Sequence, residues 1–216
     1  MIRSRALSAA AGVSVLGGAL IMLVALVELP GPWLRGYVSE AGTSGAPFAV
    51  AYRCGLVVLA CGVGLLGLAL GRVLRLAAML LAATAVLAGT SGVVPCTANC
   101  PLPPFEPTTP TDVVHTAASI AGMAVLAGAM LAVAVSRLRP AVRRLAIGAT
   151  ALTVPLAGWL GLIMLFVGRD QLGATLERIL LAVAVSWLIG TAGLLSRPGG
   201  RSPRATPARP RSNARA

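Results

Sequence analysis

The stretch from residue 133 to residue 145 reads VAVSRLRPAVRRL and joins two long apolar segments, 111–136 and 143–167. It contains four arginines and no acidic residue. Each apolar segment is about 22 to 26 residues long, which lets a tilted helix cross the hydrocarbon core of a bilayer. Short loops rich in arginine stay on the cytoplasmic side of a membrane. The stretch therefore predicts two membrane-spanning helices joined by a cytoplasmic turn.

The same alternation extends over the whole chain and predicts an all-α, six-helix transmembrane bundle. Fourteen of the eighteen arginines lie in the terminal segments and in alternate turns, and all six acids lie at or near the opposite ends of the apolar segments. By the positive-inside rule both termini are cytoplasmic, which requires an even number of spans. The predicted spans are 6–29, 47–70, 73–94, 111–136, 143–167 and 173–195. The acids are Glu28, Glu40, Glu106, Asp112, Asp170 and Glu177.

The composition excludes a soluble domain of this length. Hydrophobic residues make up 57% of the 216 residues, charged residues make up 11%, and the mean hydropathy is +0.88. Lipid can solvate such an apolar exterior, and helices satisfy their own backbone groups within it. The net charge of +12 comes from arginine alone. Because these charges are spread over short turns and a tail, they indicate topology signals and contact with lipid headgroups rather than nucleic-acid binding.

The two ends of the chain differ in character. The run 6–29 is too long for the apolar region of a typical signal peptide and ends without a small-residue cleavage site, so we interpret it as a retained first helix. Residues 196–216 are rich in Pro, Gly and Arg and have no apolar periodicity, so a disordered cytoplasmic tail is expected there. The predicted organisation is a six-span domain at 1–195 followed by this tail.

Two of the four cysteines have the spacing of a disulfide. Cys96 and Cys100 lie between the third and fourth spans, on the predicted outer and oxidising side, where such a pair closes a small loop. A redox-active pair is the alternative. A zinc site would need two further ligands, and His115 is the only histidine. Cys54 and Cys61 are seven residues apart on one helix and cannot bridge each other. We therefore predict one disulfide, no metal site and no cofactor.

The fourth span begins with a helix-start signal and contains the single histidine. Thr109 is the expected N-cap, Pro110 follows at the first helical position, and Asp112 stands at the third. Asp112, His115 and Ser119 share one helical stripe, so the Asp112 carboxylate is placed to orient the imidazole or to favour its charged form. Two interpretations of His115 remain open: a buried structural histidine, and a residue that binds a ligand or handles protons.

Further ionisable residues lie near the predicted outer ends of the spans. Arg53 stands one or two turns inside the second span, where it must extend to the interface or find a partner. Glu177 and Arg178 are adjacent and point about 100° apart on a helix, so at least one turns into the bundle or reaches back to the interface. Ionisable residues within a membrane are functional candidates. The predicted ligand-binding set of this outer vestibule is Glu40, Arg53, Asp112, His115, Glu177 and Arg178.

Four short motifs lie near these outer ends. They are Tyr37-Val38-Ser39-Glu40, Arg53-x-Gly55-Leu56, Asp112-x-x-His115, and Gly173-x-x-x-Glu177-Arg178 with Trp187. With these motifs the chain resembles the bacterial "domain of unknown function 998" family of multi-pass membrane proteins. The resemblance extends from the first span to the sixth and leaves the tail outside. It implies a six-helix domain in the bacterial cytoplasmic membrane, with shared polar residues on the outer side, and it brings no known reaction.

The pattern favours a non-catalytic binding or accessory protein. In this hypothesis the outer vestibule holds a lipid headgroup or a small anion, and Arg53 and Arg178 are its cationic clamps. The expected partners are membrane lipids and this small anionic or lipid ligand, and the sequence indicates neither a nucleic acid nor a particular protein partner.

Two alternatives belong to other functional classes. The first is a membrane-embedded hydrolase or transferase acting on a lipid-linked substrate, with His115 as general base and Ser39 or Ser119 as nucleophile. In that mechanism Asp112 orients His115. The second is a small-molecule transporter, which is less favoured because no charge lies at mid-depth and no span is clearly discontinuous.

Overall fold

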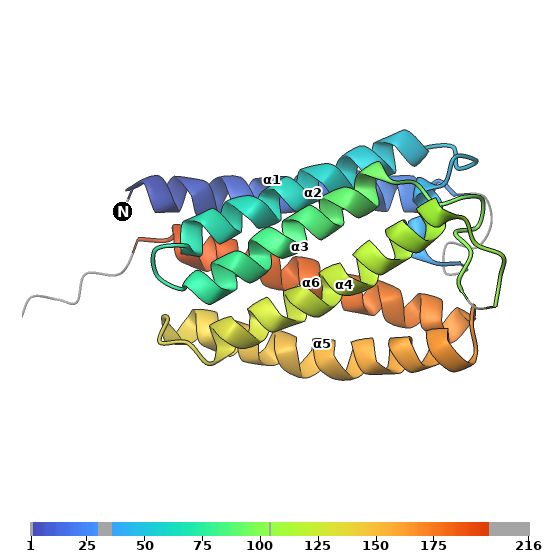
Figure 1. Cartoon of the computed structure of the whole chain (residues 1–216). Coiled ribbons are helices and arrows are strands. Elements are labelled where there is room, and N and C mark those ends of the chain that lie inside the picture. Colours follow the sequence, from blue (N-terminus) through green and yellow to red (C-terminus); the bar gives the residue numbers. More distant parts are fainter. Residues whose placement is uncertain (1, 30–35, 104, 199–216) are drawn as a thin grey trace, which may run out of the picture.

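The computed structural model describes residues 2–29, 36–103 and 105–198, and six long helices account for most of them (Figure 1). All six are long and apolar enough to cross a membrane, in agreement with the predicted fold class. The helices are α1 (Ile2–Val27), α2 (Ala49–Leu70), α3 (Arg75–Val93), α4 (Pro110–Ala134), α5 (Pro140–Phe166) and α6 (Gln171–Ser196), and a short 3-10 helix, η1 (Val38–Gly42), precedes α2. Of the predicted tail, residues 199–216 lie outside the described part of the chain.

The helices form a closed bundle in which each one packs on the next and α6 returns to α1. Large side chains fill its centre, among them Leu66, Leu81, Met130 and Trp187, which are at most 1% exposed. Many other apolar side chains point outward from every helix. Hydrocarbon solvates such a surface, and the cohesion of the bundle then depends on close packing between helices.

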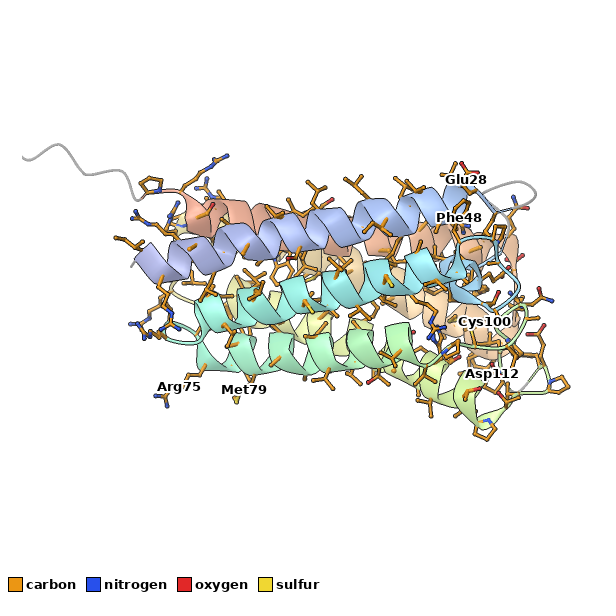
Figure 2. All side chains as sticks on the ribbon, turned by 90° about the horizontal axis from the view of Figure 1, so that it is seen from above. Glu28, Phe48, Arg75, Met79, Cys100 and Asp112 are labelled. Carbon is orange, nitrogen blue, oxygen red and sulfur yellow. A yellow bond between two sulfur atoms is a disulfide. The ribbon has the colours of Figure 1, made fainter. Side chains whose placement is uncertain are left out.

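The two ends of the bundle differ in charge. The connections α1–α2, α3–α4 and α5–α6 lie at one end, and the N-terminus and the other two connections lie at the opposite end (Figure 1). In Figure 2, Arg75 marks the second end, and Glu28, Cys100 and Asp112 mark the first. We call the first the acidic end, since it contains Glu28, Glu40, Glu106, Asp112, Asp170 and Glu177. Its assignment to the outer side of the membrane stays a prediction from the positive-inside rule.

The backbones of α1 and α2 are in contact where Gly18 faces Gly55. A Cβ atom at Gly18 would lie 2.4 Å from the Gly55 carbonyl oxygen, and one at Gly55 would lie 2.9 Å from the Gly18 carbonyl oxygen. Because the obstacle on each side is backbone rather than a flexible side chain, the helices must separate to admit a methyl group.

We therefore expect Gly18→Ala to destabilise the bundle by about 1 to 3 kcal/mol, the usual cost of overpacking. Gly17→Ala is the matched control, because a Cβ atom at Gly17 meets nothing within 4 Å while the gain in helix propensity is the same. Thermal unfolding in detergent, followed by helical circular dichroism, measures the difference. Equal melting temperatures for the two variants would contradict the close approach.

Candidate functional site

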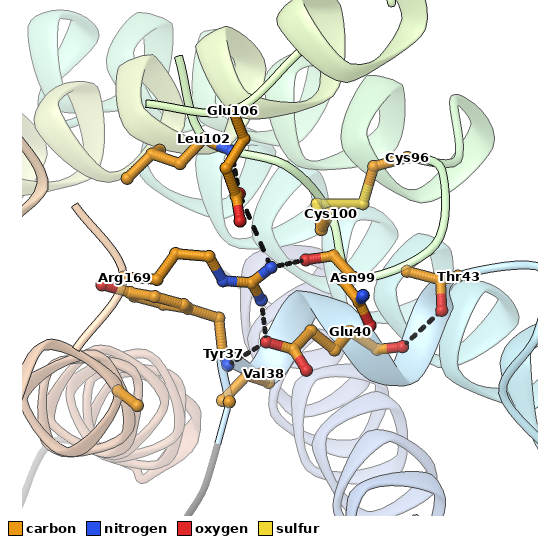
Figure 3. A network of polar contacts seen from close by, with 12 residues as sticks. Tyr37, Val38, Glu40, Thr43, Cys96, Asn99, Cys100, Leu102, Glu106 and Arg169 are labelled. Atoms are coloured by element: carbon orange, nitrogen blue, oxygen red, sulfur yellow. Dashed lines mark hydrogen bonds and ion pairs between the residues drawn. A yellow bond between two sulfur atoms is a disulfide. The ribbon is translucent and has the colours of Figure 1, made fainter. Parts of the chain in front are cut away.

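At the acidic end, the side chain of Arg169 joins three connections of the chain (Figure 3). Arg169 follows α5, and its guanidinium pairs with the carboxylate of Glu40 in η1 and donates to the carbonyl oxygen of Asn99 between α3 and α4. Glu106, from the α3–α4 connection, places its Oε2 atom 3.7 Å from the Nη1 atom of Arg169. The guanidinium carbon lies 5.9 Å from the centre of the Tyr37 ring, within the range of a cation–π contact. One cation thus links the α1–α2, α3–α4 and α5–α6 connections.

Local backbone features position the residues of this network. The backbone N–H of Tyr37 donates to Oε1 of Glu40 at 2.8 Å and fixes the carboxylate over the start of η1. Gly168 has a φ of 83°, a conformation that suits glycine and turns the chain just before Arg169. Asp170 then caps α6 by accepting hydrogen bonds from the first two backbone N–H groups of that helix.

An open pocket of about 500 Å³ lies beside the Arg169 network, within the usual size range of small-ligand sites. Its lining residues are Gly36, Tyr37, Glu40, Asn99, Arg169, Asp170 and Gln171. Two of them carry carboxylates and one carries a guanidinium that is already ion-paired, so the pocket has an excess of negative charge.

Tyr37 lies between this pocket and α6. Its side chain is buried, and a Cβ atom on Gly173 would lie 2.4 Å from the Tyr37 hydroxyl oxygen, so the glycine provides the room that the phenol needs. Burial, with a further contribution from the Glu177 carboxylate, raises the pKa of Tyr37 above its ordinary value of 10.0. The hydroxyl therefore stays protonated throughout the neutral range.

Two charged residues of α6, Glu177 and Arg178, bind the segment on either side of Tyr37. The Glu177 carboxylate accepts a hydrogen bond from the backbone N–H of Val38 at 2.6 Å. Arg178 donates from Nη1 to the carbonyl oxygen of Gly36 at 2.8 Å. Both residues thus reach back to the α1–α2 connection, and the motif at 173–178 holds the motif at 37–40 in place.

Arg53 caps the end of α3. Its Nε atom donates to the carbonyl oxygen of Gly92 at 3.1 Å, and its Nη2 atom donates to that of Val93 at 2.9 Å. Helix C-terminal carbonyls lack partners within the helix and carry partial negative charge, so a guanidinium stabilises them. Arg53 therefore binds main-chain carbonyls at the end of α3, and Arg178 binds the carbonyl of Gly36 in the α1–α2 connection. Neither arginine is among the residues that line the pocket.

Asp112 is fully buried, and its carboxylate accepts hydrogen bonds from four donor groups. Two come from Thr97, from its backbone N–H at 2.7 Å and its hydroxyl at 3.1 Å. The other two come from Thr109, the N-cap of α4, from its backbone N–H at 2.8 Å and its hydroxyl at 2.6 Å. The helix-start signal is thus present as predicted, and the same carboxylate fastens the α3–α4 connection to α4.

The predicted orientation of His115 by Asp112 needs correction. The Nδ1 atom of His115 lies 2.8 Å from the Val94 carbonyl oxygen, and both ring nitrogens lie 3.4 Å from the Ser91 hydroxyl. The hydrogen bonds of Asp112 go instead to two threonines, because its carboxylate faces the α3–α4 connection.

The two candidate nucleophiles lie apart from each other. The Ser119 hydroxyl contacts that of Ser91 at 2.8 Å and donates to the carbonyl oxygen of His115 at 2.9 Å. Ser39 belongs to η1, in the α1–α2 connection, whereas His115 lies on α4 beside the end of α3. The arrangement favours the interpretation of His115 as a buried, hydrogen-bonded histidine.

The predicted pairing of Cys96 with Cys100 is present in the structure, with the two sulfur atoms 2.06 Å apart. Both sulfur atoms lie close to the ring of His115, and one ligand atom from each of the three residues falls within 4.8 Å of the others. Cys54 and Cys61 are not paired and are exposed on α2.

Arg169 was absent from the predicted ligand-binding set, although the sequence contains a signal for it. Only four of the eighteen arginines lie on the side opposite to the arginine-rich turns, and two of these entered the predicted set. Arg169 is a third, and Arg35 lies outside the described residues. Arginine on the side that the positive-inside rule leaves poor in it is thus the signal that could have identified Arg169.

Comparison with known proteins gives a family and no reaction. A family model described as "Protein of unknown function (DUF998)" matches residues 6–194, nearly the whole six-helix bundle. No curated protein and no solved structure matches the chain. The match bears out the resemblance that the short motifs indicated.

Proposed function

The chain belongs to the DUF998 family of proteins of unknown function, and we propose that it is a multi-pass membrane protein that binds a ligand without transforming it. The proposed site is the pocket beside Arg169, at the outer surface of a bacterial cytoplasmic membrane with both termini inside. The proposed ligand is the polar headgroup of a membrane lipid. Six helices long and apolar enough to span a membrane support the setting, and the position of the pocket at the acidic end supports contact with headgroups.

The chemistry of the lining residues favours a headgroup that carries an ammonium group beside a phosphate. Glu40 and Asp170 offer carboxylates to the ammonium, and Arg169 with the amides of Asn99 and Gln171 offers donors to the phosphate. This mixed lining is the observation that carries the proposal. A small anion suits the pocket less well, because the two carboxylates of the pocket outnumber its one guanidinium.

Binding is favoured over hydrolysis because the predicted catalytic residues already have structural partners. The Asp112 carboxylate binds two threonines, and Nδ1 of His115 faces the Val94 carbonyl oxygen. A general base needs a nucleophile within hydrogen-bonding reach. The Ser91 hydroxyl lies 3.4 Å from the His115 ring nitrogens and also contacts the Ser119 hydroxyl at 2.8 Å.

The test is the affinity of the purified protein, in lipid nanodiscs, for short-chain phosphatidylethanolamine, measured by native mass spectrometry. Asp170→Asn removes a pocket charge but keeps a good N-cap residue, so α6 should be undisturbed. We expect it to weaken binding about tenfold, which is about 1.4 kcal/mol. Glu28→Gln is the matched control, because Glu28 is an exposed acid at the same end of the bundle and does not line the pocket.

Two results would contradict the proposal. One is equal affinity of the wild type and Asp170→Asn. The other is tighter binding of the purely anionic short-chain phosphatidylglycerol, which would favour the small-anion hypothesis.

A further inference from the structure

We propose that reduction of the Cys96–Cys100 disulfide creates a zinc site formed by Cys96, Cys100 and His115. Their possible ligand atoms all lie within 4.8 Å of one another. Cys96 and His115 are buried, and Cys100 is half-buried. Two thiolates and an imidazole are ligands that Zn²⁺ prefers, and three protein ligands leave a fourth position for water or another group. In the oxidised chain both sulfur atoms are in the disulfide, so the site belongs to the reduced chain.

The tautomer of His115 suits a zinc ligand. A carbonyl oxygen only accepts hydrogen bonds, so the contact of 2.8 Å between Nδ1 and the Val94 carbonyl oxygen places the proton on Nδ1. A neutral imidazole protonated on Nδ1 has its lone pair on Nε2. Metal-binding histidines commonly donate one ring N–H to a carbonyl in this way, which fixes the tautomer and the ring orientation.

A second set of contacts keeps the cysteines beside His115 when the disulfide opens. Thr97 follows Cys96 directly, and its backbone N–H and hydroxyl both donate to Asp112, one turn before His115 on α4. These hydrogen bonds do not depend on the sulfur–sulfur bond. The loop is therefore fastened to α4 independently, and the thiols stay near the imidazole.

A dithiol reductant can open the Cys96–Cys100 disulfide. Thiol–disulfide exchange transfers two electrons and two protons to the Cys96–Cys100 bond, which breaks to give two thiols, and the reductant becomes a disulfide. Zinc binding then releases the two thiol protons. Two thiolates neutralise the charge of Zn²⁺, and a neutral complex is suited to a buried position, where unpaired charge is costly.

The test uses the 216-residue protein in detergent, either oxidised or reduced by a dithiol that is then removed by gel filtration without oxygen. Zn²⁺ binding is measured by competition with a chromophoric chelator, and Co²⁺ serves as the spectroscopic probe of thiolate ligation. We expect one zinc ion per reduced chain and none per oxidised chain. Cys100→Ser should abolish binding, and His115→Gln should weaken it at least about tenfold, as loss of a ligand or its orientation does.

The control is the double variant Cys54→Ser/Cys61→Ser, which removes the unpaired cysteines and should bind zinc as the wild type does. Cys100→Ser leaves α4 and His115 unchanged, so it tests the site even if His115→Gln fails to fold. The proposal is overturned if the reduced wild type binds no more zinc than Cys100→Ser. It is also overturned if binding is lost in the Cys54→Ser/Cys61→Ser variant.

Discussion

Replacement of Asp112 by alanine is expected to lower the free energy of unfolding by about 3 to 5 kcal/mol. The carboxylate is fully buried and accepts hydrogen bonds from four donor groups, two of which are backbone N–H groups. A hydrogen bond to a charged group contributes about 1.5 to 3 kcal/mol, and a buried donor left without a partner adds a desolvation cost. Unfolding in detergent by a denaturant titration measures the change.

Asp170→Ala is the matched control for this prediction. Asp170 also caps a helix, but it is exposed, so its loss should cost only about 1 kcal/mol. Double-mutant cycles distinguish the contact of Asp112 with Thr97 from its predicted pairing with His115. If Asp112 acts on Thr97, the effects of Asp112→Ala and Thr97→Ala are strongly non-additive, while those of Asp112→Ala and His115→Gln add. The opposite pattern would restore the predicted pairing of Asp112 with His115.

The number and the kind of the helices could be predicted from the sequence because both follow from local properties. A run of about 20 apolar residues must form a helix if it lies in lipid, since no water can satisfy its backbone groups. The arginine turns set the alternation of the chain between the two ends of the bundle. Neither signal says how two helices pack, so the contact of Gly18 with Gly55 was not foreseen.

The ionisable residues stand out in the sequence because they lie in or beside apolar spans, but their partners could not be predicted. Arg53 binds the last carbonyls of α3, Glu177 binds the backbone N–H of Val38, and Arg178 binds the carbonyl of Gly36. Every residue carries the same backbone groups, so nothing in the sequence marks which of them will accept or donate. The sequence therefore favoured one shared vestibule, whereas in the structure Arg53 binds the end of α3, and Glu177 and Arg178 bind the α1–α2 connection.

Arg169 was missed for a related reason. It lies in a loop between two spans. The criterion of an ionisable residue within a membrane span therefore does not select it. Its importance comes from its position between Glu40 and the carbonyl of Asn99, which are far from it in the sequence. Of the residues in the predicted set, Glu40 pairs with Arg169 and lines the pocket, whereas Arg53 and Arg178 bind main-chain carbonyls elsewhere.

Because Arg169 joins the three connections, Arg169→Ala is expected to have a large effect on their local stability. Loss of the guanidinium separates η1 from the α3–α4 connection and removes a wall of the pocket. Hydrogen exchange of the backbone in 36–43 and 97–103 should become at least about tenfold faster, because these segments open locally at a lower free energy. Global stability should change by only about 1 kcal/mol or less, since the Arg169 and Glu40 side chains are 22% and 23% exposed and solvent screens such pairs.

Arg53→Ala is the control for this result, because Arg53 is an arginine at the same end of the bundle whose side chain binds the Gly92 and Val93 carbonyls at the end of α3. It should accelerate exchange near Val93 and leave 36–43 unchanged. Binding of short-chain phosphatidylethanolamine should fall about tenfold or more in Arg169→Ala and stay constant in Arg53→Ala. If exchange in both segments is unaffected by Arg169→Ala, the three connections are held by the α6 and Asp112 contacts, and the proposed linking role of Arg169 is wrong.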